Sequence, residues 1–239
     1  MPANLKLSHI AARCAETLPA LAGDIRPSES PPADWLVHEG AEMAKIHANL
    51  KREYAHADDV YWGCRAWQLW IWQPLYLAVW AAAVWRVVPD LGGFRHRMGE
   101  VFTDVYTLPE QTLDVLPVQQ AVFQTALHLQ QWMRRQRGLI LPHYPLADKL
   151  VQYFLGDGVL KALAAAQRFG LLDKEAVLQQ QQWWQAALDC RCRGRLVWLE
   201  EEQGFQVEMA ACCQHYRCHE GVLCAGCPKE RKQRQECGC

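Results

Sequence analysis

The sequence predicts an α+β fold that is mainly α, with a helical body followed by a small cysteine-rich segment. The chain has 239 residues, 51% of them apolar, so it can bury a sizeable core. Long stretches before residue 190 have helical apolar spacing, whereas Leu196–Leu199 and Phe205–Met209 flank a polar run and predict a β-hairpin. We therefore expect a mainly helical body over residues 1–189, with the hairpin and the cysteine-rich segment over residues 190–239.

The first part of the body predicts two helices separated by a loop. Residues 1–22 have the spacing of a short helix, and prolines and serines over residues 27–32 break the chain after it. A second helix is expected over residues 35–56, with its apolar side chains on one face. Asp34 is a suitable N-cap for this helix, because a carboxylate accepts hydrogen bonds from the first backbone N–H groups.

An uncharged stretch over residues 66–85 is long enough to cross a bilayer, but its composition argues against a span. Two glutamines and Pro74 interrupt it, and tryptophan prefers the membrane interface to the hydrocarbon centre. We expect a buried core helix that is capped by Asp58 or Asp59, bent at Pro74 and ended before Pro89. The tryptophans of this stretch are Trp67, Trp70, Trp72, Trp80 and Trp85.

The second part of the body predicts a strand pair and then more helices. β-branched and aromatic residues over residues 101–107 indicate a strand that pairs with residues 94–98 across a glycine turn. Helical spacing resumes over residues 117–137, and Gly138 is expected to end that helix. Three further helices are expected, at residues 142–155, 157–169 and 173–188.

The eleven cysteines are distributed unevenly. Cys14 and Cys64 are the only ones in the first 189 residues, and the other nine fall between Cys190 and Cys239. A secreted disulfide scaffold would require a signal peptide with a long apolar segment and a cleavage site, and residues 1–19 contain no long apolar segment and no clear cleavage site. We therefore expect a reducing cytoplasm, with the clustered thiols serving as metal ligands. The net charge of −1 gives no reason to expect nucleic acid as a partner, and peripheral contact with a membrane is left open.

Four of these cysteines have the spacing C-C-x10-C-x2-C. Structural zinc usually sits between two C-x2-C pairs, and only the second half of this pattern is such a pair. Vicinal side chains point in different directions, which suits two irons and two sulfides better than one tetrahedral ion. The spacing favours a [2Fe-2S] cluster. A zinc-stapled binding or scaffold protein without redox activity stays the alternative, as does an iron–sulfur electron carrier or sensor. The four cysteines are Cys212, Cys213, Cys224 and Cys227.

This segment resembles the C-terminal end of the FhuF-type ferric-siderophore reductases. That family combines the same cysteine spacing with a Tyr-Arg pair after the vicinal cysteines and a Pro after the last one, which Tyr216, Arg217 and Pro228 supply here. The resemblance covers the final quarter of the chain, and the body is similar in kind only.

The resemblance implies an oxidoreductase whose [2Fe-2S] cluster is ligated by Cys212, Cys213, Cys224 and Cys227. It implies one-electron transfer to the Fe(III) of a ferric siderophore, release of Fe(II) in the cytoplasm, and an unidentified cytoplasmic electron donor. No catalytic acid or base is expected, because the cofactor does the chemistry.

Other groups near the motif are interpreted as secondary. His215 and His219 are expected to face solvent or form hydrogen bonds, because four thiolates are already available. Basic residues could attract an anionic ferric chelate or a donor protein, or simply be solvated; they are Arg217, Lys229, Arg231, Lys232 and Arg234. Five cysteines outside the motif are interpreted as spare thiols, namely Cys190, Cys192, Cys218, Cys237 and Cys239. The alternative is that all of these except Cys218 converge on a second ion or a disulfide.

Overall fold

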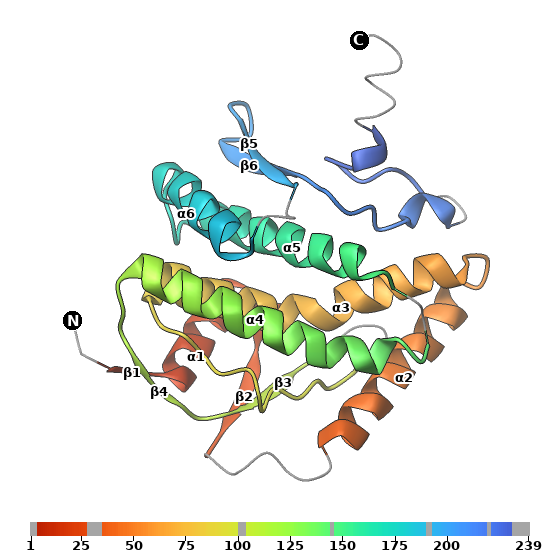
Figure 1. The fold of residues 1–239 in the computed structure, drawn as a ribbon, viewed down its shortest axis with the longest axis horizontal. Coiled ribbons are helices and arrows are strands. Elements are labelled where there is room, and N and C mark those ends of the chain that lie inside the picture. The colour runs from red at the N-terminus through yellow and green to blue at the C-terminus, as the bar shows by residue number, and fades with distance from the viewer. Residues whose placement is uncertain are drawn as a thin grey trace.

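The fold is mainly helical, with short two-stranded sheets and a β-hairpin near the C-terminal end, which confirms the predicted fold class (Figure 1). Helix α3 (Asp59–Trp80) lies at the centre and packs against both α4 (Val118–Ile140) and α5 (Asp148–Arg168). The short strands and α1 lie on one side of these helices, and α6 and the hairpin lie on the other. This computed structural model describes residues 4–27, 35–99, 104–143, 146–189, 193–218 and 221–230.

The tryptophan-rich stretch is the core helix that its composition predicts. Trp67, Trp70 and Trp80 of α3 have no exposed surface. Asp58 is the N-cap, and its carboxylate accepts the backbone N–H of Tyr61 at 3.0 Å. The helix continues through the buried proline and through a π-helical turn at Ala81–Trp85, so it ends before Pro89 as expected. Within the described ranges, no helix is both long enough and apolar enough to span a bilayer.

Two predicted helix boundaries are wrong. Helix α4 runs to Ile140, so Gly138 lies inside it rather than after it. The helices predicted at residues 142–155 and 157–169 are one helix, α5, which passes through two glycines without a break. Gly158 has a packing role there, because a Cβ at this position would come within 2.8 Å of Leu75 Cδ1 on α3. Glycine therefore allows the close approach of α3 and α5 and does not end the helix.

The N-terminal elements combine with strands from the middle of the chain. Helix α1 is shorter than predicted (Leu7–Thr17) and lies between β1 (Asn4–Lys6) and β2 (Gly23–Arg26). Strand β1 pairs antiparallel with β4 (Thr112–Asp114), and β2 pairs in parallel with β3 (Tyr106–Pro109). Neither pairing was predicted, because it joins strands of three or four residues from distant parts of the chain.

The predicted strand at residues 101–107 is confirmed only in part. Residues 101–103 lie outside the described ranges, and β3 extends over Tyr106–Pro109 instead. Of the predicted pairing with residues 94–98, the described residues include an antiparallel bridge in which Arg95 and Thr107 exchange backbone hydrogen bonds of 2.9 Å. The backbone N–H of Asp104 also donates to the Arg97 carbonyl at 2.8 Å.

A buried charged cluster joins α2 (Trp35–Glu53) to the chain before β3. Glu39 has no exposed surface, and its carboxylate accepts the backbone N–H of His96 at 2.9 Å and contacts the ring Nδ1 at 2.7 Å. The other ring nitrogen, Nε2, lies 2.7 Å from the Trp70 carbonyl oxygen, to which it must donate. Glu39 and His96 therefore share one proton between them. The Asp34 cap predicted for α2 lies outside the described ranges.

The C-terminal part contains the predicted hairpin. Helix α6 (Lys174–Ala187) begins at the N-cap Asp173 and precedes β5 (Arg195–Leu199) and β6 (Gly204–Glu208). The two strands pair antiparallel, with Leu196 opposite Val207. The hairpin packs on α5, and the chain then continues over α5 toward the start of α3 (Figure 1). The predicted division at residue 190 stays a prediction.

Candidate metal centre

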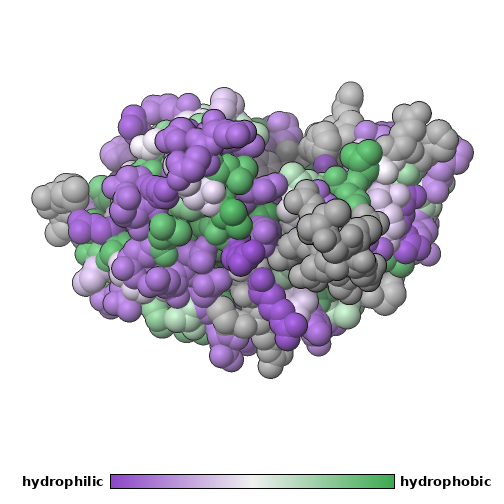
Figure 2. All heavy atoms as spheres, turned by 90° about the horizontal axis from the view of Figure 1, so that it is seen from above, coloured by the Kyte–Doolittle hydropathy of each residue, from purple (hydrophilic) through white to green (hydrophobic). Residues whose placement is uncertain are grey.

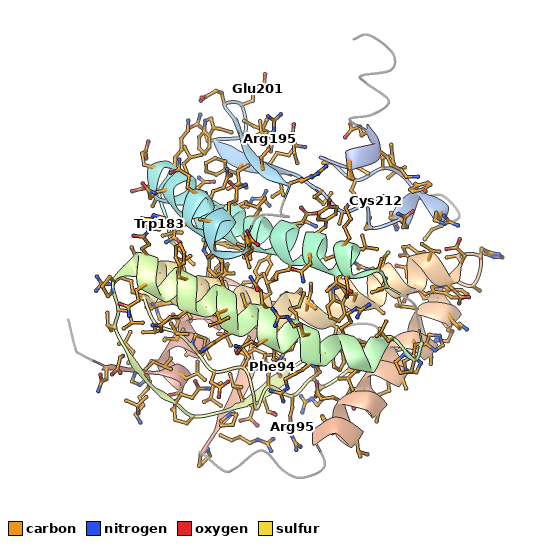
Figure 3. The ribbon with its side chains drawn as sticks, viewed as in Figure 1. Phe94, Arg95, Trp183, Arg195, Glu201 and Cys212 are labelled. Carbon is orange, nitrogen blue, oxygen red and sulfur yellow. The ribbon has the colours of Figure 1, made fainter. Side chains whose placement is uncertain are left out.

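A buried carboxylate of α5 fixes the chain just before the first two cysteines. Asp157 is 2% exposed, and its two oxygens accept the backbone N–H groups of Ala210 at 2.8 Å and Ala211 at 2.7 Å. A Cβ at Gly194 would come within 2.6 Å of the same carboxylate, so glycine leaves room for it. The cysteine-bearing segment is thus held on a rigid helix. Figure 3 shows Cys212 on this segment, with Phe94 on the opposite side of the helices.

The four predicted ligands come together as two pairs of sulfur atoms. Cys212 Sγ lies 3.9 Å from Cys227 Sγ, and Cys213 Sγ lies 3.2 Å from Cys224 Sγ. Two thiolates on one tetrahedral metal, each about 2.3 Å from it, are separated by about 3.8 Å. The two separations lie on either side of this value. Each pair is therefore close to the spacing of two cysteines on one metal.

The four sulfurs offer the number of ligands that a dinuclear cluster would need. Among the described residues, no three His, Cys, Asp or Glu side chains gather as ligands of a single ion. Cys212 and Cys213 are adjacent in the chain but belong to different sulfur pairs, so the two pairs would offer two ligands to each of two metals, as a [2Fe-2S] cluster requires. Cys212 and Cys227 would hold one metal, and Cys213 and Cys224 would hold the other.

Two left-handed residues shape the loops that carry the thiols. Gln214 has φ 63°, and its N–H lies 3.4 Å from Cys212 Sγ, to which it donates. Gly226 has φ +72°, and its carbonyl accepts the N–H of Met209 at 2.9 Å. A Cβ at Gly226 would overlap the carbonyl oxygen of Val207 in β6. This position therefore requires glycine twice over, for its φ angle and for its contact with the hairpin.

Burial favours the protonated form of two of the four thiols, Cys212 and Cys224, when no metal is bound. Removal from solvent raises the pKa of Cys212 and of Cys224 to about 11. Because a metal binds the thiolate, its binding displaces these protons. Cys64 of α3 has no exposed surface, and burial, followed by the neighbouring Cys212 and Cys213, raises its pKa to about 12. Its proximity to the site could not be predicted, because Cys64 is far from the motif in the sequence.

The spacer between the cysteine pairs attaches to the N-terminal end of α3. Arg217 forms an ion pair with Asp58, the residue that caps α3. The Tyr216 hydroxyl donates to Gln214 Oε1 at 3.0 Å, and Lys229 lies over the Tyr216 ring, 3.9 Å from its centre. Of the basic residues singled out in the sequence, Arg217 and Lys229 therefore have structural contacts. The other three, Arg231, Lys232 and Arg234, lie outside the described ranges.

The remaining sequence candidates have mixed outcomes. His215 Nδ1 lies 3.5 Å from the Tyr61 hydroxyl, in agreement with its expected hydrogen-bonding role. Cys218 interacts with the same tyrosine, whose pKa is raised mainly by burial and then by Cys218. Neither residue takes part in the two sulfur pairs. The hypothesis of a second ion or disulfide concerns Cys190, Cys192, Cys237 and Cys239, which all lie outside the described ranges. His219 also lies outside them.

A cavity of about 620 Å³ opens beside one of the sulfur pairs. Its walls come from α3, α5, the hairpin and the cysteine segment. Cys213 and Cys224 both line it, whereas Cys212 and Cys227 do not. Sequence reasoning missed this cavity, because its walls lie far apart along the chain.

The comparisons with protein families and with solved structures identify no family for this chain. No protein-family model matches the chain, and no solved structure matches it. A function for this protein must therefore be inferred from the paired cysteines and their surroundings.

Proposed function

We propose that this protein is a ferric-siderophore reductase that contains a [2Fe-2S] cluster. The observation that carries the proposal is the arrangement of four cysteine sulfurs in two pairs, with separations of 3.9 and 3.2 Å. The spacing of the same cysteines, with Tyr216, Arg217 and Pro228, resembles the reductase family and supports the substrate class. We place the reaction in the cytoplasm, where thiols stay reduced.

The chemistry needs one electron and no protein acid or base. When bound, a [2Fe-2S] cluster supplies one-electron transfer to the substrate iron. A siderophore holds Fe(III) through hard, anionic oxygen donors, and Fe(III) that accepts one electron becomes Fe(II). The lower charge weakens its bonds to these donors, so Fe(II) can pass to other ligands. A reduced one-electron carrier protein must then restore the electron, and dithionite can do so in the test tube.

The chain contributes positioning and tuning. Asp157 fixes the cysteine segment to α5 through two backbone hydrogen bonds, which limits the motion of the ligands. The Gln214 N–H donates to Cys212 Sγ, and such hydrogen bonds stabilise the more negative, reduced state of an iron–sulfur centre. Cys227 is 2% exposed, so one side of the site is shielded from solvent.

The metal content is the first test. Protein purified without oxygen after growth with iron should contain about two irons and two sulfides per chain. It should be reddish-brown, and dithionite should bleach its visible absorption and give the EPR signal of a reduced [2Fe-2S] cluster. Cys224→Ser and Cys227→Ser should lose the cluster, while the matched control Cys14→Ser, in the buried core, should keep it. A colourless protein with one zinc would refute the proposal and support the scaffold alternative.

Substrate reduction is the second test. Dithionite-reduced protein, freed of excess reductant, is mixed with a panel of ferric chelates in a stopped-flow instrument. Reoxidation of the cluster and formation of Fe(II) should follow the same time course. A cluster that no ferric chelate reoxidises would instead identify an electron carrier or sensor.

A further inference from the structure

The cavity beside Cys213 and Cys224 has an unusual combination of charge and aromatic surface. Tyr61, Arg65 and Tyr76 lie on one face of α3, at spacings of whole helical turns. Lys161 and Arg168 lie on the facing side of α5, two turns apart. Three cations and several tyrosines therefore surround one space.

The charged side chains that line this space are predominantly cationic. The acidic residue among its described lining residues is Glu202, on the exposed turn of the hairpin. Neither Lys161 nor Arg168 forms an ion pair within the part of the chain that the structure describes. Lys161 is close enough to Cys224 to act electrostatically on its thiol. Lys161 and Arg168, with no ion-pair partner among the described residues, favour an anionic ligand in the cavity that they line.

The cavity continues into a second one along the same two helices. This second space, of about 500 Å³, shares four lining residues with the first, Arg65, Gln68, Tyr76 and Lys161. It extends toward Leu75 and other apolar residues and is also lined by Asp157, whose carboxylate accepts the backbone N–H groups of Ala210 and Ala211. Figure 2 shows the face that carries the hairpin and the cysteine segment, where hydrophilic side chains surround a smaller group of hydrophobic ones. Cavities of this size accept ligands larger than a bare ion.

The cavity touches only one of the two sulfur pairs. Cys213 and Cys224, separated by 3.2 Å, both line it. The pair formed by Cys212 and Cys227 is absent from its lining, and Cys227 is buried. A ligand in the cavity therefore lies next to one metal of the proposed cluster and farther from the other.

We propose that this cavity binds a net-anionic ferric chelate between Arg65, Lys161 and Arg168, and that the electron reaches the chelate across the Cys213–Cys224 edge. This inference rests on the proposed reductase function, which it extends by a docking site, a charge preference and a direction of electron transfer. The cations hold the oxygen-rich anionic chelate, and the tyrosine rings offer flat surfaces for its apolar or aromatic parts. A bound [2Fe-2S] cluster would supply the one electron that converts Fe(III) to Fe(II), and no bond of the protein is made or broken.

Binding can be tested without any electron transfer. Gallium(III) matches the charge and oxygen ligands of ferric iron but is not reduced, so gallium chelates report docking alone. The probes are the trianionic gallium tris-catecholate and a neutral gallium tris-hydroxamate, each titrated calorimetrically into the protein. We expect the trianionic chelate to bind at least tenfold more tightly at low salt, and the difference to shrink as salt is raised.

Variants then locate the site. Lys161→Gln and Arg168→Gln should each weaken binding of the trianionic chelate about tenfold and leave the neutral chelate nearly unaffected. Lys149→Gln is the matched control, since Lys149 lies on the same helix but outside the cavity. Ala165→Phe should block both chelates, because it fills the cavity from α5 and removes no charge. Metal content and the EPR spectrum of each variant should equal those of the unmodified protein.

The outcomes separate this inference from the proposed function. A cluster-containing protein that reduces ferric chelates, but in which Lys161→Gln, Arg168→Gln and Lys149→Gln bind the trianion equally, would leave the reductase standing and overturn the docking site. Equal affinity for the two gallium chelates would overturn the charge preference. A protein without a cluster whose cavity still binds the trianion would refute the reductase while keeping the anion site.

Discussion

Replacement of Asp157 by asparagine should loosen the cysteine segment from the helical body. The carboxylate accepts two backbone N–H groups, from Ala210 and Ala211, immediately before Cys212. Asparagine has nearly the same shape but only one acceptor oxygen. Its NH₂ group would face one of the two N–H donors, so that this buried donor would lose its partner.

The size of the effect follows from these two bonds. A hydrogen bond to a charged group contributes about 1.5–3 kcal/mol, and a neutral one about 0.5–1.5 kcal/mol. Asparagine therefore weakens one bond by about 1 kcal/mol and loses the other, which costs about 2 kcal/mol. A neutral amide is easier to bury than a carboxylate, which offsets about 1 kcal/mol. We expect a net loss of about 2 kcal/mol, or about a 30-fold larger population of the detached segment.

Hydrogen exchange measures this detachment directly. The amides of Ala210 and Ala211 should lose protection about 30-fold in Asp157→Asn, while those of α3 keep theirs. Asp173→Asn is the matched control, because Asp173 caps α6 through one hydrogen bond to Ala176 N and asparagine caps a helix equally well. Unchanged protection at Ala210 and Ala211, or an equal loss in the control, would refute the anchoring role of Asp157.

Three further predictions concern the glycine turn, the α3 cap and the buried pair. Gly226→Ala should lower the metal content measured by mass spectrometry, because the new Cβ would overlap the Val207 carbonyl oxygen. Gly138→Ala is the control, since no atom of the described residues, apart from its chain neighbours and the adjacent helix backbone, lies within 4 Å of the new Cβ. It should keep the metal and raise the free energy of unfolding by about 0.5–1 kcal/mol. Asp58 has a lowered pKa, because it accepts the Tyr61 N–H and then because it pairs with Arg217. The ionised Asp58 carboxylate therefore contributes fully to the free energy of unfolding above about pH 4, and this contribution is lost as the pH falls through the lowered pKa. In urea unfolding, the stability difference between the unmodified protein and Asp58→Asn should shrink at acid pH. A difference that stays constant from about pH 7 to about pH 3 would contradict this. Glu39→Ala should lower the free energy of unfolding by about 3–5 kcal/mol, because it leaves the buried Nδ1 of His96 unpaired. Glu39→Gln should lower it by much less, because the amide can donate to that nitrogen. Equal losses of stability in urea unfolding would speak against a proton shared by Glu39 and His96.

Local chemistry made part of the fold predictable. Asp58 caps α3 because its carboxylate is one residue before an apolar helix, and the hairpin follows from two apolar runs around a polar turn. The close approach of the two halves of the cysteine motif was expected, because their spacing predicts that they bind one metal centre, but the way the sulfurs pair was not. These features depend on residues that are close in the sequence.

Features that depend on tertiary packing could not be predicted in the same way. Residues 142–155 and 157–169 are predicted as separate helices, but Gly158 serves the contact between α3 and α5 and the helix continues. Asp157 itself has no local pattern that distinguishes a surface carboxylate from an anchor. Cys64, like the cations of the cavity, reaches the site only because α3 and α5 pack together. The short strands are defined by partners more than eighty residues away and carry little signal of their own.

The nesting of the sulfur pairs has a consequence for assembly. Cys213 and Cys224 lie between Cys212 and Cys227 in the chain, so the loop closed by the inner pair is contained in the loop closed by the outer pair. Joining two chain positions costs conformational entropy that grows with the length of the loop between them. Once the inner pair is joined, only a few residues on either side must be ordered to join the outer pair. The Cys213–Cys224 pair should therefore form before the Cys212–Cys227 pair, and the two pairs should separate in the reverse order.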